Sequence, residues 1–209
     1  MATTRTSERA LSTAETTPND PTKSIADPGP LGLAAFALTT FVLSLFNAGI
    51  APDALESTVL PLALFYGGLA QLLAGMWEFK KANTFGATAF TSYGAFWLAF
   101  AAFVKFVEPG IPEAQHETAA GIFLIGWAIF TGYMVIASLR TTGALIAVFV
   151  FLFLTFLLLA IGDLTGVSTI ATIGGILGIV TALIAWYASA AVVTNATWGR
   201  TVLPVGPRS

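Results

Sequence analysis

Long apolar runs, separated by short polar connectors, make up nearly all of this sequence from Leu31 onward. A helix that crosses a bilayer needs roughly 20 largely apolar residues. The connectors, such as "EFKKANT", "RTT" and "DLTG", leave no room for a soluble domain. We therefore expect six spanning helices, at residues 31–50, 59–77, 86–107, 119–139, 143–162 and 168–193.

Composition supports a membrane location. Only 10% of the 209 residues are charged, whereas a soluble domain carries about 25%. Because backbone groups in hydrocarbon must be paired internally, we predict an all-α integral membrane protein whose protomer is a six-helix bundle. The bundle is expected at 26–197, between a disordered N-terminal tail (1–25) and a C-terminal tail (198–209). The chain has no cysteine, which excludes disulfides and thiolate metal sites.

The charged residues predict an orientation. With six spans, one side of the membrane receives almost all of the basic residues, and the other side is acidic with Lys105 as its only basic residue. The positive-inside rule then places both termini in the cytoplasm of a multi-pass cell-membrane protein. The residues expected on the cytoplasmic side are Arg5, Arg9, Lys23, Lys80, Lys81, Arg140, Arg200 and Arg208.

The middles of the six runs carry no charged residue. This argues against a voltage sensor, a cation pump with a buried carboxylate and an intramembrane metalloprotease, which all need charges at membrane depth. Glu78 and Lys105 lie near helix ends, where snorkelling would explain them. His116 is expected to be a solvated loop residue, because one histidine cannot assemble a metal site. We expect no enzyme activity, no cofactor, no metal and no nucleic-acid partner.

Neutral polar residues remain at membrane depth. Thr40 and Asn47 share a helix face with Phe36, and Gln71 lies in the second run. Such side chains donate hydrogen bonds without a fixed charge. They either hold helices together or line a permeation path, and both interpretations stay open. The pair Gly174 and Gly178 indicates close helix packing.

The first run begins with "ADPGPLGLAAF". Proline is tolerated in the first turn of a helix, where its missing N–H would have no partner. Asp27 is either the N-cap, with Pro28 first and Pro30 still in the first turn, or part of an extended Asp27–Gly29 segment before a later cap. In both registers the prolines determine where the helix starts and therefore the depth of Phe36.

Three stretches resemble the acetate/succinate transporter family over residues 26–206. "DPGPLGLAAFALTTFVLSLFNAG" is similar to the family's entry signature, "FYGGLAQLLAGMWEFKKANTFGATAFTSYGAFW" to its second and third helices, and "WGRTVLPVG" to its C-terminal signature. The usual entry signature is Asn-Pro-Ala-Pro-Leu-Gly-Leu, and an aspartate replaces its asparagine here. The entry motif of this chain is Asp27, Pro28, Pro30, Leu31 and Gly32.

The resemblance implies a hexameric ring in which each six-helix protomer has its own pore. Family members carry acetate, and some carry succinate or other short carboxylates, by proton coupling or by channel-like conduction. The resemblance also implies a pore constriction at Phe36, Tyr93 and Leu152. Asp27 either caps the helix as an asparagine would or repels an anion at the mouth.

A narrow path lined by neutral donors can replace part of the hydration shell of an acetate ion. The candidate substrate-binding residues are Thr39, Thr40, Asn47, Gln71 and Ser92, with the Tyr93 hydroxyl as a further donor. Two alternatives remain at this point. One is a channel for a small neutral solute such as urea or an amide, and the other is a membrane scaffold that transports nothing.

Overall fold

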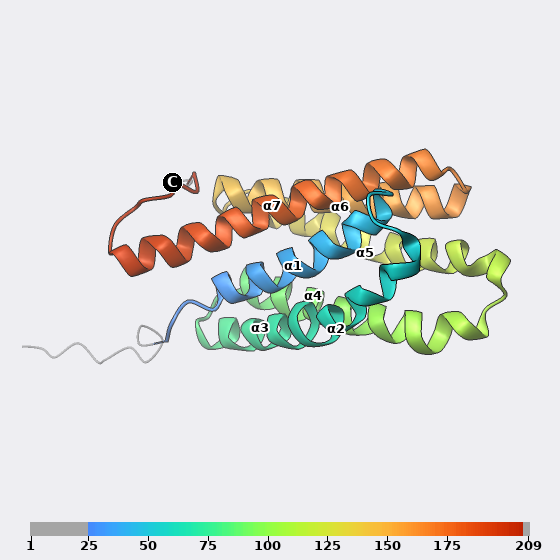
Figure 1. Cartoon of the computed structure of the whole chain (residues 1–209). Coiled ribbons are helices and arrows are strands. Elements are labelled where there is room, and N and C mark those ends of the chain that lie inside the picture. The colour runs from blue at the N-terminus through green and yellow to red at the C-terminus, as the bar shows by residue number, and fades with distance from the viewer. Residues whose placement is uncertain (1–24, 207–209) are drawn as a thin grey trace, which may run out of the picture.

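A computed structural model describes residues 25–206, and all regular structure in that range is helical (Figure 1). Six helical stretches are long and apolar enough to span a membrane. The prediction of an all-α protomer with six spans is therefore confirmed. The main helices are α1 (Gly29–Asn47), α2 (Val59–Leu64), α3 (Gln71–Lys80), α4 (Thr84–Ala102), α5 (His116–Ser138), α6 (Gly143–Thr165) and α7 (Ser168–Trp198).

Two of the spans contain turns of other helical types. The second span runs from Asp53 to Lys80, through a 3-10 turn (Asp53–Thr58), α2, a π-helical stretch (Phe65–Ala70) and α3. The third span continues from α4 through a second π-helical stretch, Phe103–Val107, and a short 3-10 turn. A π-helical turn is wider than an α-helical turn, so it changes the direction in which the following side chains point. The first π-helical stretch, Phe65–Ala70, directly precedes Gln71.

The helix ends differ from those expected from hydropathy. The first span ends at Asn47 rather than at 50, and Gly49 adopts a φ of +66° shortly after it. The last helix continues to Trp198, beyond the expected end at 193, and stops at Gly199 with a φ of +64°. Helices end where a left-handed residue stops them, which an apolar run does not reveal. The expected N-terminal tail, 1–25, lies almost entirely outside the described residues.

The segment after α7 folds back onto the bundle. The N–H groups of Gly143 and Ala144, at the start of α6, donate to the carbonyls of Gly206 and Val205 at 2.7 and 3.1 Å. The Asn195 side chain accepts two N–H groups from the same returning segment, at 2.7 and 3.0 Å. The C-terminal stretch that was expected as a tail thus supplies partners for N–H groups that a helix start leaves unpaired.

Glycines bring the helices into close contact. A Cβ added at Gly94 in α4 would lie 2.6 Å from the backbone nitrogen of Leu72 in α3. In α7, Gly174 faces Leu159 of α6, whereas Gly178 faces Ser44 of α1. The Gly174–Gly178 pair therefore packs α7 against two helices, as the close-packing interpretation expects.

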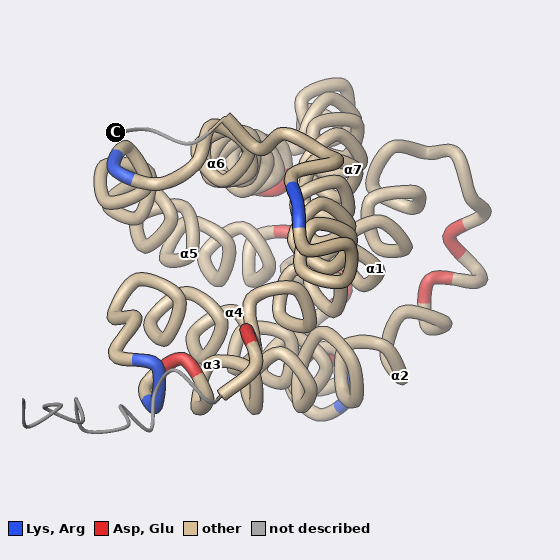
Figure 2. Tube along the Cα trace, turned by 90° about the vertical axis from the view of Figure 1, so that its left-hand side faces the viewer, with Lys and Arg blue, Asp and Glu red and all other residues tan. Residues whose placement is uncertain are grey.

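The two ends of the bundle differ in charge. We call one the basic end, because it carries Lys80, Lys81, Arg140 and Arg200 at helix ends and turns. Both ends of the described chain also lie there, and Figure 2 looks onto it. The opposite, acidic end carries Asp53, Glu56, Glu108, Glu113, Glu117 and Asp163 together with Lys105.

Replacing Gly94 with alanine should destabilise the bundle. The new Cβ would meet the backbone of α3 at 2.6 Å, and relieving such overpacking typically costs about 1–3 kcal/mol. We expect a lower unfolding temperature for purified Gly94→Ala in detergent. Gly126→Ala is the matched control, because its added Cβ would have no atom within 4 Å apart from its chain neighbours and the backbone of its own helix. Equal unfolding temperatures for Gly94→Ala and the wild type would contradict this account of the α3–α4 contact.

Candidate functional site

Two cavities lie along the bundle, one toward each end. The acidic-end cavity, of about 380 Å³, has Glu56, Glu117 and Asp163 among its lining residues. The basic-end cavity, of about 170 Å³, is lined among others by Asp27 and Glu78. The two cavities approach each other in the middle of the bundle, where they share lining residues.

The shared residues are Phe36 of α1 and Leu152 of α6. Both side chains are buried, and both are apolar. Tyr93 of α4 lines the basic-end cavity, and its ring centroid lies 5.8 Å from that of Phe36. These are the three residues that the resemblance implied for the constriction. They belong to three different helices and lie near the level at which the two cavities approach each other.

The Tyr93 hydroxyl is already engaged. It lies 2.9 Å from the Thr131 hydroxyl, which itself donates to the Trp127 carbonyl at 2.8 Å. Because the single hydroxyl proton of Thr131 is donated to that carbonyl, the Tyr93 hydroxyl donates to the Thr131 oxygen. Phe130 packs edge-on against the Tyr93 ring at 5.3 Å. Tyr93 therefore presents its ring to the cavity, and its hydroxyl is not the free donor that we expected.

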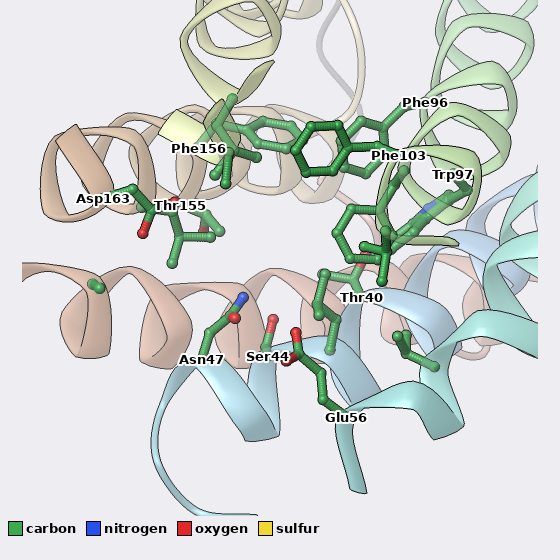
Figure 3. Close-up of a pocket in the computed structure, with 18 of the residues that line it drawn as sticks. Thr40, Ser44, Asn47, Glu56, Phe96, Trp97, Phe103, Thr155, Phe156 and Asp163 are labelled. Carbon is green, nitrogen blue, oxygen red and sulfur yellow. The ribbon is translucent and has the colours of Figure 1, made fainter. Parts of the chain in front are cut away.

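The acidic-end cavity contains polar groups without partners. The Thr40 hydroxyl and the Trp97 indole N–H are buried and have no hydrogen bond within the described part of the chain. Both residues line this cavity. Figure 3 shows Thr40, Ser44 and Asn47 along one face of α1, with Thr155 of α6 across the cavity. A buried donor without a partner is costly, so this cavity is suited to a guest that accepts hydrogen bonds.

The basic-end cavity also contains an unpaired polar atom. Gln71, only 1% exposed, buries its amide oxygen without a partner among the described residues. Its neighbours around the cavity include the carboxyl groups of Asp27 and Glu78 and the amide of Asn83. The free Gln71 oxygen accepts hydrogen bonds, so it can accept the O–H of a protonated carboxylic acid.

Two of the five candidate substrate-binding residues line neither of these cavities. Thr39 donates to the Ala35 carbonyl at 3.0 Å and faces Gly67, so it belongs to the contact between α1 and the second span. Ser92 is half-buried outside both linings. Thr40, Asn47 and Gln71 do line the cavities.

The entry motif starts α1 one residue later than the first of the two registers has it, with Pro28 as the N-cap and Gly29 as the first helical residue. The Asp27 carboxylate accepts the Gly29 N–H at 2.9 Å, and the Pro28 carbonyl accepts the Gly32 N–H at 3.1 Å. Helical hydrogen bonding thus begins at Pro28, and Pro30 lies in the first turn. Asp27 lies just before the N-cap, where its carboxylate accepts the first helical N–H, and it also lines the basic-end cavity.

The rest of the entry motif anchors α1 to its neighbours. The Pro30 carbonyl accepts the Ser189 hydroxyl of α7 at 2.7 Å. A Cβ on Gly32 would lie 2.6 Å from the Phe90 ring of α4, so this position has room only for glycine. Leu31 points outward and is exposed. These contacts hold the start of α1, and with it the level of Phe36, against α4 and α7.

Two charged or titratable residues differ from their sequence interpretation. Glu78 does not snorkel: it is 3% exposed and accepts a hydrogen bond from the Asn83 amide at 2.8 Å. His116 is a partnered residue, with Nε2 2.8 Å from the Ile111 carbonyl and Nδ1 3.8 Å from a Glu108 oxygen. No group of three or more histidine, cysteine or acidic residues that could hold a metal occurs in residues 25–206.

Sequence reasoning missed Trp97 and Thr155 as lining residues. Trp97 is four positions after Tyr93, and Thr155 is three after Leu152, so each shares a helix face with a constriction residue. Helical spacing from Tyr93 and Leu152 would have found both.

Known proteins match this chain over most of its length. The model of the GPR1/FUN34/yaaH family matches residues 11–207. Accumulation of dyads protein 2 of Saccharomyces cerevisiae is 47% identical over 80% of this chain, which spans only 61% of that relative. The succinate-acetate/proton symporter SatP of Escherichia coli is 43% identical, with 87% of this chain and 96% of the relative aligned.

A solved structure agrees with the fold. The structure of the bacterial acetate channel SatP matches with a TM-score of 0.81 and 42% identity, covering 87% of this chain and 99% of that one. The family resemblance seen in the sequence is thereby confirmed, as is a multi-pass membrane protein with six apolar helices. The chain belongs to the GPR1/FUN34/yaaH family.

Proposed function

We propose that this chain carries acetate and other short carboxylates, such as succinate, across the membrane through its own six-helix protomer. The observation that carries the proposal is that two cavities from opposite ends approach each other at Phe36 and Leu152. The names of SatP, as a succinate-acetate/proton symporter and as an acetate channel, support this choice of substrate.

The cavities suit a weakly held anion. A bare carboxylate is prohibitively costly to move into hydrocarbon, whereas Thr40 and Trp97 offer buried hydrogen-bond donors that have no partner in the described protein. Among residues 25–206, neither cavity lining includes a lysine or an arginine, so no fixed cation of this part of the chain would retain the anion. Phe36, Leu152 and the ring of Tyr93 form the apolar gate in this proposal.

The proposal includes an orientation and an assembly. The basic end faces the cytoplasm, in agreement with the positive-inside rule, so both termini are cytoplasmic and the bundle spans the cell membrane. The assembly is a hexameric ring, as the resemblance implies. Large apolar side chains exposed on α3 and α5, such as Trp77 and Ile129, suit contact with lipid or with neighbouring protomers. The proposal covers both proton-coupled and channel-like transport.

Enlarging the gate should speed permeation and relax size selectivity. We expect Phe36→Ala and Leu152→Ala to raise labelled-acetate flux in proteoliposomes several-fold and to admit butyrate more readily, because each removes buried apolar bulk at the shared level. Leu154→Ala is the matched control, since Leu154 lies on the same helix and outside both cavities. If neither gate variant alters rate or selectivity, the gate assignment is wrong.

Two adjacent threonines test the role of the lining donors. Thr40→Val removes an unpaired hydroxyl from the acidic-end cavity and should weaken acetate binding about tenfold, the value of one hydrogen bond to a charged group. Thr39→Val makes the same change one residue away, outside both cavities, and should leave binding unchanged. Saturation-transfer NMR of the acetate methyl group measures both affinities. If Thr40→Val and Thr39→Val bind acetate with equal affinity, Thr40 is not part of the proposed path.

A channel for a small neutral solute is the second candidate function. The acidic residues that line both cavities, Glu56 and Asp163 at one end and Asp27 and Glu78 at the other, favour it because they repel anions. Competition against labelled acetate uptake separates the two functions. Propionate should compete if the substrate is a carboxylate, and urea should compete if it is a neutral amide. Liposomes permeable to neither acetate nor urea above the lipid background would leave only a scaffold.

A further inference from the structure

We propose that Glu78 is a ligand for the carboxyl group of the substrate, and that the two carboxyl groups meet with one proton between them. This inference rests on the proposed function, because it concerns the form in which a carboxylate occupies the basic-end cavity. It assigns the proton to a residue of this chain rather than to the substrate alone.

The burial of Glu78 is the first argument. This side chain is 3% exposed, yet it lines the basic-end cavity. Its Oε2 accepts the Asn83 amide at 2.8 Å, whereas Oε1 has no hydrogen bond within residues 25–206. A carboxyl oxygen without a partner, on the wall of a cavity, is a free acceptor for a guest.

The residues around Glu78 leave room for its carboxyl group and hold it in place. A Cβ on Gly86 would lie 2.8 Å from the carboxyl carbon of Glu78, and one on Gly29 would lie 3.6 Å from Oε1. Glycines at the starts of α4 and α1 therefore make the space that the carboxyl group occupies. Asn83 both caps α4, through the Gly86 N–H at 3.1 Å, and donates to Glu78, so the carboxyl group is held by the same residue that starts the helix.

The charges around Glu78 exclude a second bare anion. Asp27 is a like charge and Lys81 a countercharge, and these are the charged groups that act on Glu78 among the described residues. Lys81 does not line the cavity, and its Nζ donates to the Ile25 carbonyl at 3.1 Å. A carboxylate entering this cavity thus meets the carboxylates of Asp27 and Glu78, and no lysine or arginine of the described chain lies on the wall.

One proton removes this conflict. When it lies between an oxygen of Glu78 and an oxygen of the substrate, one carboxyl group donates an O–H bond and the other accepts it, as in carboxyl pairs that share a proton. No covalent bond other than O–H forms or breaks, and the pair carries a single negative charge. The Gln71 amide oxygen, unpaired on the wall of the same cavity, only accepts hydrogen bonds and so adds no donor to this pair.

Proton uptake on acetate binding tests the assignment. In weakly buffered detergent solution at pH 7 to 8, addition of pH-matched acetate to the wild-type protein should take up protons from the medium. Glu78→Gln should lose this uptake, because its amide N–H takes the place of the shared proton while its oxygen can still accept from Asn83. No uptake by the wild type, or equal uptake by Glu78→Gln, would overturn the proposal.

Three further variants make the result specific. Glu113→Gln removes an exposed acid outside both cavities and should take up protons as the wild type does. Asp27→Asn keeps the cap on Gly29, removes one like charge and should retain the uptake. Should Glu78→Gln fail to fold, Glu78→Asp keeps a titratable group and must retain the uptake. A wild-type protein that gives liposomes no acetate flux would refute the proposed function, which is a separate readout from the protons.

Discussion

A backbone in hydrocarbon must pair its own polar groups, so the spans are helices and only their side chains can make a passage. In this protein the contacts around α1 decide where that passage runs. Gly175 and Gly178 of α7 pack closely against Asn47 and Ser44 of α1, and Gly67 packs closely against Thr39. Asn47 and Ser44 also line the acidic-end cavity, so α7 packs against the same face of α1 that borders this cavity.

The neighbouring residues Thr39 and Thr40 show how much this arrangement decides. The Thr39 hydroxyl donates to the Ala35 carbonyl, and its side chain packs against Gly67. Thr39 therefore belongs to the contact between α1 and the second span. Thr40 lies about 100° further around α1, and its hydroxyl is unpaired in a cavity. Interhelical contact and cavity lining were competing interpretations of one sequence pattern, and the structure contains both on a single helix.

The number of spans and the lining face of α1 could be predicted, because both follow from local periodicity. The burial of Glu78 could not, since it depends on the chain turning back so that Asn83 and Gly86 surround the carboxyl group. The Tyr93 hydroxyl finds its partner on Thr131, which lies 38 residues away in the sequence. Local pattern therefore predicts which residues lie at membrane depth, whereas tertiary contacts decide which polar atoms remain free.

Charge at the basic end has two separate roles. Lysines and arginines lie at the helix ends and turns there, where they agree with a cytoplasmic orientation, but none of them lines the cavity at that end. The cavity has Asp27 and Glu78 on its wall instead, so its own charge is opposite in sign to that of the surrounding surface. Cations on the surface draw anions toward the mouth, and carboxylates on the wall admit a carboxylate readily only when a proton comes with it. Separating the two signs of charge lets one end attract a substrate without holding it.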